Sequence, residues 1–191
     1  MKSILTLLIV VIILLVGCDT VSDLSVNNNP DGFYKSSRSL TLIPLPNKSP
    51  LWEDSVFTMS KEIDGTVGAR MNMEKYYIAE NGDSIVITAN LYIPPGAFEG
   101  KETITMTVDD DNAAIHYYPS MVFKDTLHLF QSFKGLNLEE YPTGTIDFVY
   151  VYPDGSVALV KKNGVQVIVP SGIVRVQNAL MTHFSRYGWV R

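Results

Sequence analysis

The sequence of 191 residues contains one cysteine, Cys18, so an intrachain disulfide is impossible. A folded domain made from this chain therefore depends on the burial of apolar side chains for its stability. Basic residues are also few, since 15 Lys and Arg stand against 20 Asp and Glu, a formal net charge of −5. No cluster of Lys and Arg offsets this acidity, so we expect no nucleic acid partner, because a phosphate backbone would be repelled.

The sequence lacks the motifs of the common catalytic centres. It has no Gly-x-Ser-x-Gly elbow, no His-Glu-x-x-His pair and no glycine-rich phosphate loop. The three histidines, His116, His128 and His183, lie in separate segments without a second His or a Cys at ligand spacing. We therefore expect a protein that is not an enzyme and has no catalytic residue, metal site or cofactor. A hydrolase whose residues converge only in the folded chain is the alternative that stays open.

The densest acidic cluster is Asp109-Asp110-Asp111-Asn112, directly after a predicted strand. Neighbouring carboxylates could help to bind Ca²⁺, which prefers oxygen ligands. However, the alternating ligands, central Gly and distal Glu of a calcium loop are absent. A solvated turn, in which Asp and Asn bond their own backbone, is the favoured interpretation. Calcium binding by Asp109–Asp111 is the alternative that stays open.

Long apolar runs are confined to the start of the chain. Lys2 precedes an apolar run from Ile4 to Val16 that is broken only by Thr6. A basic head followed by about a dozen apolar residues is typical of a secretory signal. The run is short for a membrane-spanning helix, which needs about 20 apolar residues. Residues 1–17 are thus predicted to be a signal peptide, with an uncleaved signal anchor as the alternative.

The quartet Leu15-Val16-Gly17-Cys18 resembles the lipobox of bacterial lipoproteins. This resemblance implies cleavage between Gly17 and Cys18, a diacylglyceryl thioether on Cys18 and an acyl chain such as palmitate on its amine. Each buried methylene adds about 0.8 kcal/mol, so two or more chains give a stable membrane anchor. We therefore expect a lipoprotein of the cell envelope. Asp19 resembles the enterobacterial inner-membrane retention signal, which other phyla do not follow, so the choice between inner and outer membrane stays open.

Residues 18–50 have the composition of a tether. They contain Asn27-Asn28-Asn29-Pro30-Asp31-Gly32, Ser36-Ser37 and three further prolines, the last at Pro50. Such a segment buries too little apolar surface to offset the entropy lost on ordering. The composition predicts a flexible coil that spans roughly 30 Å root-mean-square, in which Leu40–Ile43 could dock on the domain as a strand. The folded domain is expected over residues 51–191.

From about residue 56 onward, apolar and polar residues alternate with a period of two, which is typical of strands with one buried face. The clearest rows run over residues 85–93, 103–108, 146–152 and 165–169. Turn residues separate them at Asp64-Gly65, Asn81-Gly82-Asp83, Pro153-Asp154-Gly155, Asn163-Gly164 and Pro170-Ser171-Gly172. Asn163-Gly164 is the strongest hairpin indication, and residues 135–141 could form one helical turn. The pattern predicts an all-β fold, an antiparallel β-sandwich.

The stretch from Ser84 to Gly135 contains the string Ile93-Pro94-Pro95-Gly96-Ala97, followed later by Tyr118-Pro119 and Phe123. Two prolines fix φ and lack backbone donors, so a strand must leave its sheet there. This corner resembles that of the ZU-five domain, the β-sandwich shared by zonula occludens proteins, netrin receptors and ankyrins. The resemblance implies a non-enzymatic interaction or scaffold module, here with an unidentified envelope protein as its partner.

Several aromatic residues could bind a ligand. Tyr117, Tyr118, Tyr187 and Trp189, together with Trp52, could form an exposed platform for sugars or a partner, or else occupy the core of the sandwich. The terminal segment His183–Trp189 is either a recognition edge or the last strand, with Phe184 and Tyr187 or Trp189 inside and Arg186 paired on the surface. A carbohydrate-binding accessory domain is the alternative function.

Overall fold

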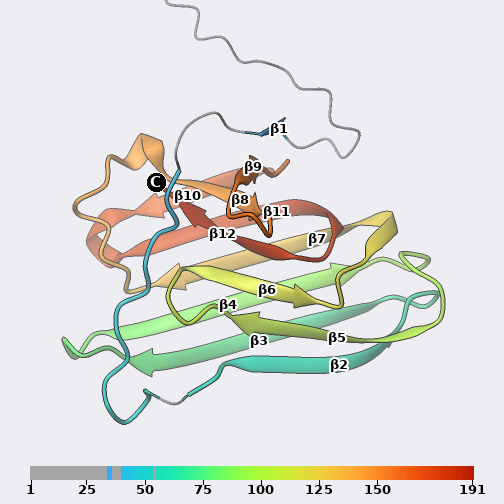
Figure 1. Cartoon of the computed structure of the whole chain (residues 1–191), viewed down its shortest axis with the longest axis horizontal. Coiled ribbons are helices and arrows are strands. Elements are labelled where there is room, and N and C mark those ends of the chain that lie inside the picture. The colour runs from blue at the N-terminus through green and yellow to red at the C-terminus, as the bar shows by residue number, and fades with distance from the viewer. Residues whose placement is uncertain (1–33, 36–39, 54) are drawn as a thin grey trace, which may run out of the picture.

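The computed structural model of the chain describes residues 34–35, 40–53 and 55–191 (Figure 1). Two antiparallel sheets pack face to face in this part of the chain, which confirms the predicted all-β antiparallel sandwich. The seven-stranded sheet contains, in order, β1 (Tyr34–Lys35), β9 (Val157–Leu159), β8 (Asp147–Val151), β12 (Arg186–Val190), β6 (Ala114–Tyr118), β5 (Lys101–Val108) and β2 (Thr58–Asp64). The five-stranded sheet contains, in order, β10 (Gly164–Ile168), β11 (Ile173–His183), β7 (Val122–Lys134), β4 (Ser84–Ile93) and β3 (Ala69–Ile78).

The only helical turns among the described residues are two short 3₁₀ helices, η1 (Thr143–Thr145) and η2 (Val169–Ser171). The helical turn expected over residues 135–141 is absent. That segment is an irregular loop closed by a turn in which the Tyr141 amide donates to the Leu138 carbonyl at 3.1 Å. Among the described residues, no helix has the length and apolar character needed to cross a bilayer.

Most of the predicted turns join neighbouring strands, as expected. Asn81-Gly82-Asp83 connects β3 to β4, and Gly82 has a φ of 87°, which glycine adopts without strain. Residues 153–155 connect β8 to β9, and residues 169–172 connect β10 to β11. Gly172 is required at its turn, because a Cβ there would lie 2.2 Å from the Leu136 carbonyl oxygen.

The predicted hairpin at Asn163-Gly164 is wrong. The strands on either side of it, β9 and β10, lie in different sheets, so this segment carries the chain from one sheet to the other. Gly164 is not among the glycines with positive φ, and the Asn163 amide instead extends the β10–β11 ladder by donating to the Gln177 carbonyl at 3.0 Å. The reason is that β9 already pairs with β8, and β10 with β11, through the turns on their other sides.

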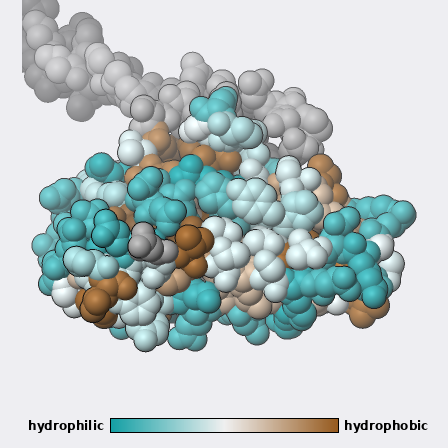
Figure 2. Space-filling model, turned by 60° about the horizontal axis from the view of Figure 1, so that its bottom comes forward, coloured by the Kyte–Doolittle hydropathy of each residue, from teal (hydrophilic) through white to brown (hydrophobic). Residues whose placement is uncertain are grey.

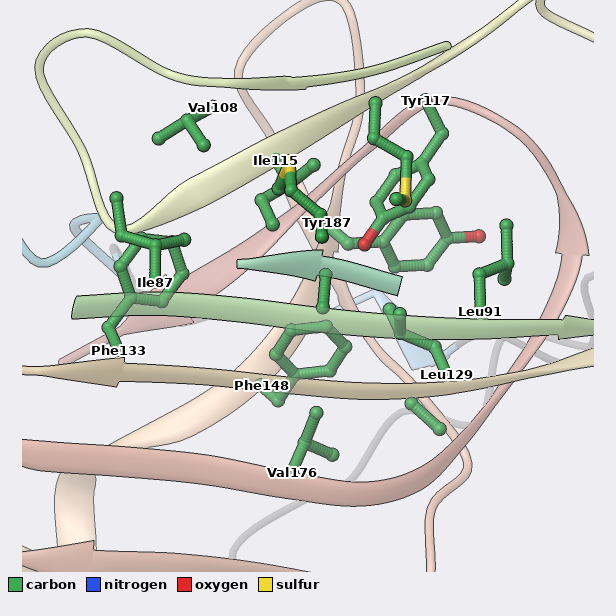
Figure 3. Close-up of a cluster of buried hydrophobic side chains, with 14 of the residues drawn as sticks. Ile87, Leu91, Val108, Ile115, Tyr117, Leu129, Phe133, Phe148, Val176 and Tyr187 are labelled. Carbon is green, nitrogen blue, oxygen red and sulfur yellow. The ribbon is translucent and has the colours of Figure 1, made fainter. Parts of the chain in front are cut away.

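The core lies between the two sheets. Alternate residues of β4, from Ile85 to Ile93, are at most 1% exposed, as their spacing predicts. Side chains from both sheets meet there (Figure 3). The five-stranded sheet contributes Ile87, Leu91, Leu129 and Phe133, and the seven-stranded sheet contributes Ile115, Tyr117, Phe148 and Tyr187. With no disulfide available, this apolar contact is what holds the sheets together.

Residues 40–49, which we call the strap, run along one end of the sandwich and belong to the folded unit (Figure 1). Ile43 is fully buried and Leu45 is 7% exposed. The Ile43 amide donates to the Trp189 carbonyl at 2.8 Å, and isolated bridges join the strap to both sheets. The strap therefore packs on the sandwich expected over residues 51–191, because two apolar side chains of this proline-rich segment insert into the core.

The sandwich contains a buried polar pair across its two sheets. Tyr117 and Gln131 are both fully buried, and the Tyr117 hydroxyl donates to Gln131 Oε1 at 3.0 Å. Gln131 Nε2 has no hydrogen-bond partner among the described residues. Burial raises the pKa of the Tyr117 hydroxyl far above its ordinary value, so the group stays a neutral donor.

We expect Tyr117→Phe to lower the free energy of unfolding by about 1–3 kcal/mol, because Gln131 Oε1 then stays buried without a donor. The double variant Tyr117→Phe/Gln131→Leu should regain most of that loss, since it removes both polar groups. Urea unfolding followed by fluorescence measures both. A double variant less stable than Tyr117→Phe alone would contradict the explanation.

Candidate functional site

Three of the residues considered for a binding platform lie in the core. Tyr117, Tyr187 and Trp189 are each 0% exposed, and the Tyr117 and Tyr187 rings meet edge to face with centroids 5.9 Å apart. They are therefore core residues and do not form an exposed platform. Tyr118 is 50% exposed on the opposite face of β6, as the alternation of a strand requires.

The segment from residue 183 to residue 189 is the end of β11 and the last strand, β12. Phe184 is buried beside Tyr117, with stacked rings 5.8 Å apart. His183 is partly buried, its ring 4.5 Å from that of Tyr150, and its carbonyl accepts a hydrogen bond from the Tyr187 hydroxyl at 2.9 Å. Arg186 pairs with Asp109 at 2.8 Å. Of the two interpretations of this segment, the structure therefore agrees with the one that makes it the last strand.

The corner at Ile93–Ala97 also behaves as its sequence predicts. β4 ends at Ile93, and the chain then passes to β5 in the other sheet. Gly96 has a φ of 86°, and its amide donates to the Gly65 carbonyl at 2.8 Å. Ala97 is fully buried, so the corner is anchored in the core. Pro94 and Pro95 thus end a strand, and the corner is structural in this chain.

Asp109 is the centre of a polar network on the outer face of the seven-stranded sheet. Its Oδ2 atom lies 3.1 Å from His116 Nε2 and 2.8 Å from Arg186 Nη2. Its Oδ1 atom accepts hydrogen bonds from the backbone amides of Asp111 and Asn112 at 3.1 and 2.8 Å. Burial raises the pKa of Asp109, but the hydrogen bonds from His116 and Asn112 and the charge of Arg186 outweigh it and lower that pKa to about 2.

This network holds the loop between β5 and β6 in place. Asp110 forms an ion pair with Lys48 at 2.9 Å, and the Asp111 carbonyl accepts the Leu45 amide at 2.8 Å. The carboxylates of Asp109 and Asp110 thus face separate partners, and Asp111 is fixed through its backbone, as in a structural turn. No group of three or more His, Cys, Asp or Glu in the described part of the chain is arranged to hold a metal ion.

The His116–Asp109 pair has the form of a catalytic dyad but lacks a nucleophile. The second ring nitrogen of His116 faces the Tyr118 hydroxyl at 3.4 Å, and the two rings are stacked. Within the described ranges, no Ser, Thr or Cys side chain is hydrogen-bonded to His116. A triad needs a nucleophile within hydrogen-bonding reach of its base, so this geometry supports a loop-fixing role.

A groove lies at the end of the sandwich where the strap crosses it; we call it the end groove. Its volume is about 700 Å³, within the size range of ligand sites. Four segments line it: strap residues 44–47, residues 79–84 of the β3–β4 turn, residues 135–141 of the loop after β7, and residues 169–172 before β11. These segments meet at the left end of the sandwich in Figure 1. Loops carried by a rigid sandwich are a common place for binding.

The lining of the end groove is acidic. It contains Glu80, Asp83, Glu139 and Glu140 and no Lys, Arg or His. The Glu80 carboxylate accepts a hydrogen bond from Asn47 Nδ2 at 3.2 Å, and the Asp83 carboxylate accepts one from Asn81 Nδ2 at 2.7 Å. These amide partners are neutral, so they leave the negative charge uncompensated.

The rest of the surface offers few large apolar side chains. Those exposed among the described residues are Leu51, Val56, Val67, Tyr76, Tyr118 and Val122. Figure 2 shows apolar residues as small separate spots on a mainly hydrophilic face. That face presents no continuous apolar surface of the kind that marks a protein interface.

Comparisons with protein-family models, with curated proteins and with solved structures found no match to this chain. The predicted signal peptide and its cleavage point at Gly17 and Cys18 lie outside the described residues. Sequence reasoning did not identify the end groove. The sequence features that could have indicated this groove are the acidic residues at two turns, Glu80 with Asp83 and Glu139 with Glu140. Acidic residues are too common at turns to single out a site.

The pKa of Asp109 makes a test of the network possible. A carboxyl whose pKa is lowered on folding stabilises the folded state above its unfolded pKa, near 3.9, and loses that effect as the pH falls through the folded value, about 2. We expect Asp109→Asn to lower the free energy of unfolding by about 1.5–3 kcal/mol at neutral pH, as for a hydrogen bond to a charged group.

The stability difference between wild type and Asp109→Asn should shrink between about pH 4 and pH 2. Urea unfolding at a series of pH values measures it. Asp125→Asn is the control, because the Asp125 side chain is exposed and bonds only the neighbouring Thr126 amide. A difference that stays constant down to pH 2 would refute the role of the Asp109 charge.

Proposed function

We propose that this chain is a lipid-anchored, non-enzymatic interaction module of the bacterial cell envelope. In this proposal, Cys18 carries the lipid, and the end groove of the sandwich contacts an envelope protein. The lipobox-like quartet before Cys18 supports the anchor. The ZU-five-like corner at Ile93–Ala97 supports an interaction or scaffold domain. The end groove is the observation that carries the proposal.

The roles of the reactive side chains in the fold favour binding over catalysis. Asp109, His116 and Arg186 fix a loop. Tyr117 and Tyr187 are buried with neutral hydroxyls, whose pKa values burial raises. The four carboxylates of the end groove, by contrast, are exposed and form no ion pair among the described residues. A concave surface with uncompensated charge, and without a histidine beside the two serines that line it, Ser84 and Ser171, suits recognition.

The anchor would keep the domain close to its membrane. Sixteen Cα–Cα steps separate Cys18 from Tyr34, the start of β1. A fully extended chain of this length spans at most about 55 Å. A partner of the end groove would therefore lie within the membrane-proximal layer of the envelope.

Three of the five residues named for the carbohydrate-binding alternative are unavailable to it, whereas Trp52 is partly buried and Tyr118 is half-exposed. Tyr117, Tyr187 and Trp189 would have to be exposed to stack on sugar rings, and all three are fully buried. Of the platform residues in β6 and β12, only Tyr118 presents its ring to solvent.

The anchor is tested by Cys18→Ala. We expect this change to abolish incorporation of labelled palmitate and to leave the protein as an uncleaved precursor. Metabolic labelling followed by mass spectrometry of the amino-terminal peptide measures both. A wild-type protein with a free Cys18 thiol on an intact amino-terminal segment would refute the proposed lipid anchor.

The interaction is tested by photo-cross-linking in living cells. A photoreactive amino acid at Asn137 or Ser171, both exposed in the lining of the end groove, should give one discrete adduct. The same amino acid at Val67 or Val122, which are 69% and 80% exposed, should not. Val67 lies in the β2–β3 turn and Val122 begins β7, and these segments are at the opposite end of the sandwich (Figure 1). Equal yields from both ends, or none from the groove, would count against the proposed docking surface.

A further inference from the structure

The four carboxylates of the end groove form two pairs on two separate segments. Glu80 and Asp83 lie on the β3–β4 turn, and Glu139 and Glu140 lie on the loop that follows β7. From this arrangement we infer that the end groove binds a segment of the partner protein that carries two or more lysine or arginine side chains. This inference rests on the proposed function, because it names the chemistry of the partner at the same site.

The carboxylates of the end groove differ from those acidic side chains of the chain that have a basic partner. Elsewhere, carboxylates such as Asp110, Asp147 and Glu99 form ion pairs with Lys48, Lys162 and Lys124. The four groove carboxylates form no ion pair in the described part of the chain, and no basic side chain lines the groove. Like charges around a hollow surface focus a negative potential into it, which attracts cations. The ligand chemistry that complements the groove is therefore cationic.

The walls of the groove fit the stems of long cationic side chains. Val169 and Pro170 form one wall and Pro44 and Pro46 another. Lysine and arginine bury their methylene stems on apolar surface while the charged ends reach polar groups. At the edge of the groove, the Tyr141 ring already accepts a guanidinium, since Arg191 lies 4.3 Å above its centroid.

A protein segment fits this groove better than a single cation does. A lone cation can neutralise one carboxylate pair, whereas a chain with spaced basic residues can contact both pairs at once. The prolines of the walls fix their own backbone, so little conformational entropy is lost when a ligand binds. A volume of about 700 Å³ accommodates several side chains.

The test uses the full chain in detergent and a fluorescent twelve-residue probe peptide of glycine and serine with four spaced lysines. A groove variant carries Glu80→Gln, Asp83→Asn, Glu139→Gln and Glu140→Gln. A control variant removes the same charge outside the groove through Glu53→Gln, Glu74→Gln, Glu102→Gln and Asp125→Asn, all exposed positions without an ion pair among the described residues. Anisotropy gives Kd at low and high salt, and thermal melting verifies that both variants fold.

We expect the groove variant to bind the probe peptide about tenfold more weakly or worse, since each exposed ion pair is worth up to about fivefold in affinity. The control variant should change Kd by less than about threefold, and salt should weaken wild-type binding. Equal losses in both variants would assign binding to overall charge and overturn the inference. So would an absence of wild-type binding, or displacement of the peptide by spermine at concentrations below the peptide's own Kd.

The two proposals can fail separately. If groove cross-links capture a partner whose contacting segment has no lysine or arginine, the inference is wrong and the docking surface stands. If no groove cross-link forms, the proposed docking surface falls, whatever the probe peptide does in solution.

Discussion

The structure depends on the apolar contact between the inner faces of its two sheets. The chain has one cysteine and so no intrachain disulfide, and no group of ligands in the described part is arranged to hold a metal. Burial must therefore supply the stability that disulfide-bonded domains obtain partly from covalent links. This explains why the large aromatic residues, Trp189 and Tyr187 among them, are in the core and unavailable for binding. The buried polar pair of Tyr117 and Gln131 adds a directional contact between the two sheets.

The strap makes the end groove a consequence of folding. Ile43 and Leu45 are held in the core, and Pro44 and Pro46 lie beside them in the wall of the groove. The Tyr77 hydroxyl donates to the Pro46 carbonyl at 2.6 Å, which ties this wall to β3. The same contacts that close one end of the sandwich therefore position one side of the groove. A rigid wall of this kind favours binding because less entropy is lost when a ligand is ordered.

The sequence predicts local features well and non-local ones poorly. Alternation over residues 85–93 places a strand with its buried face correctly, because a period of two is a property of the strand alone. Asn163-Gly164 fails as a hairpin because strand pairing is decided by the competing partners β8 and β11. Burial of the strap is hard to predict because the prolines around Ile43 give this segment the composition of a loop. The end groove is assembled from four segments far apart in the sequence, so no local pattern can predict it.

The acidity of the end groove also bears on how an anchored domain would sit at a membrane. A surface of anionic lipids repels carboxylates, so the pairs at Glu80 and Glu139 would turn away from it. The repulsion is screened within about 8 Å at physiological salt. It would therefore orient a domain that touches the membrane without holding it at a distance. In the proposed function, a lipid on Cys18 and an acidic groove would act together: the first would limit the reach of the domain, and the second would direct its open end toward proteins of the envelope.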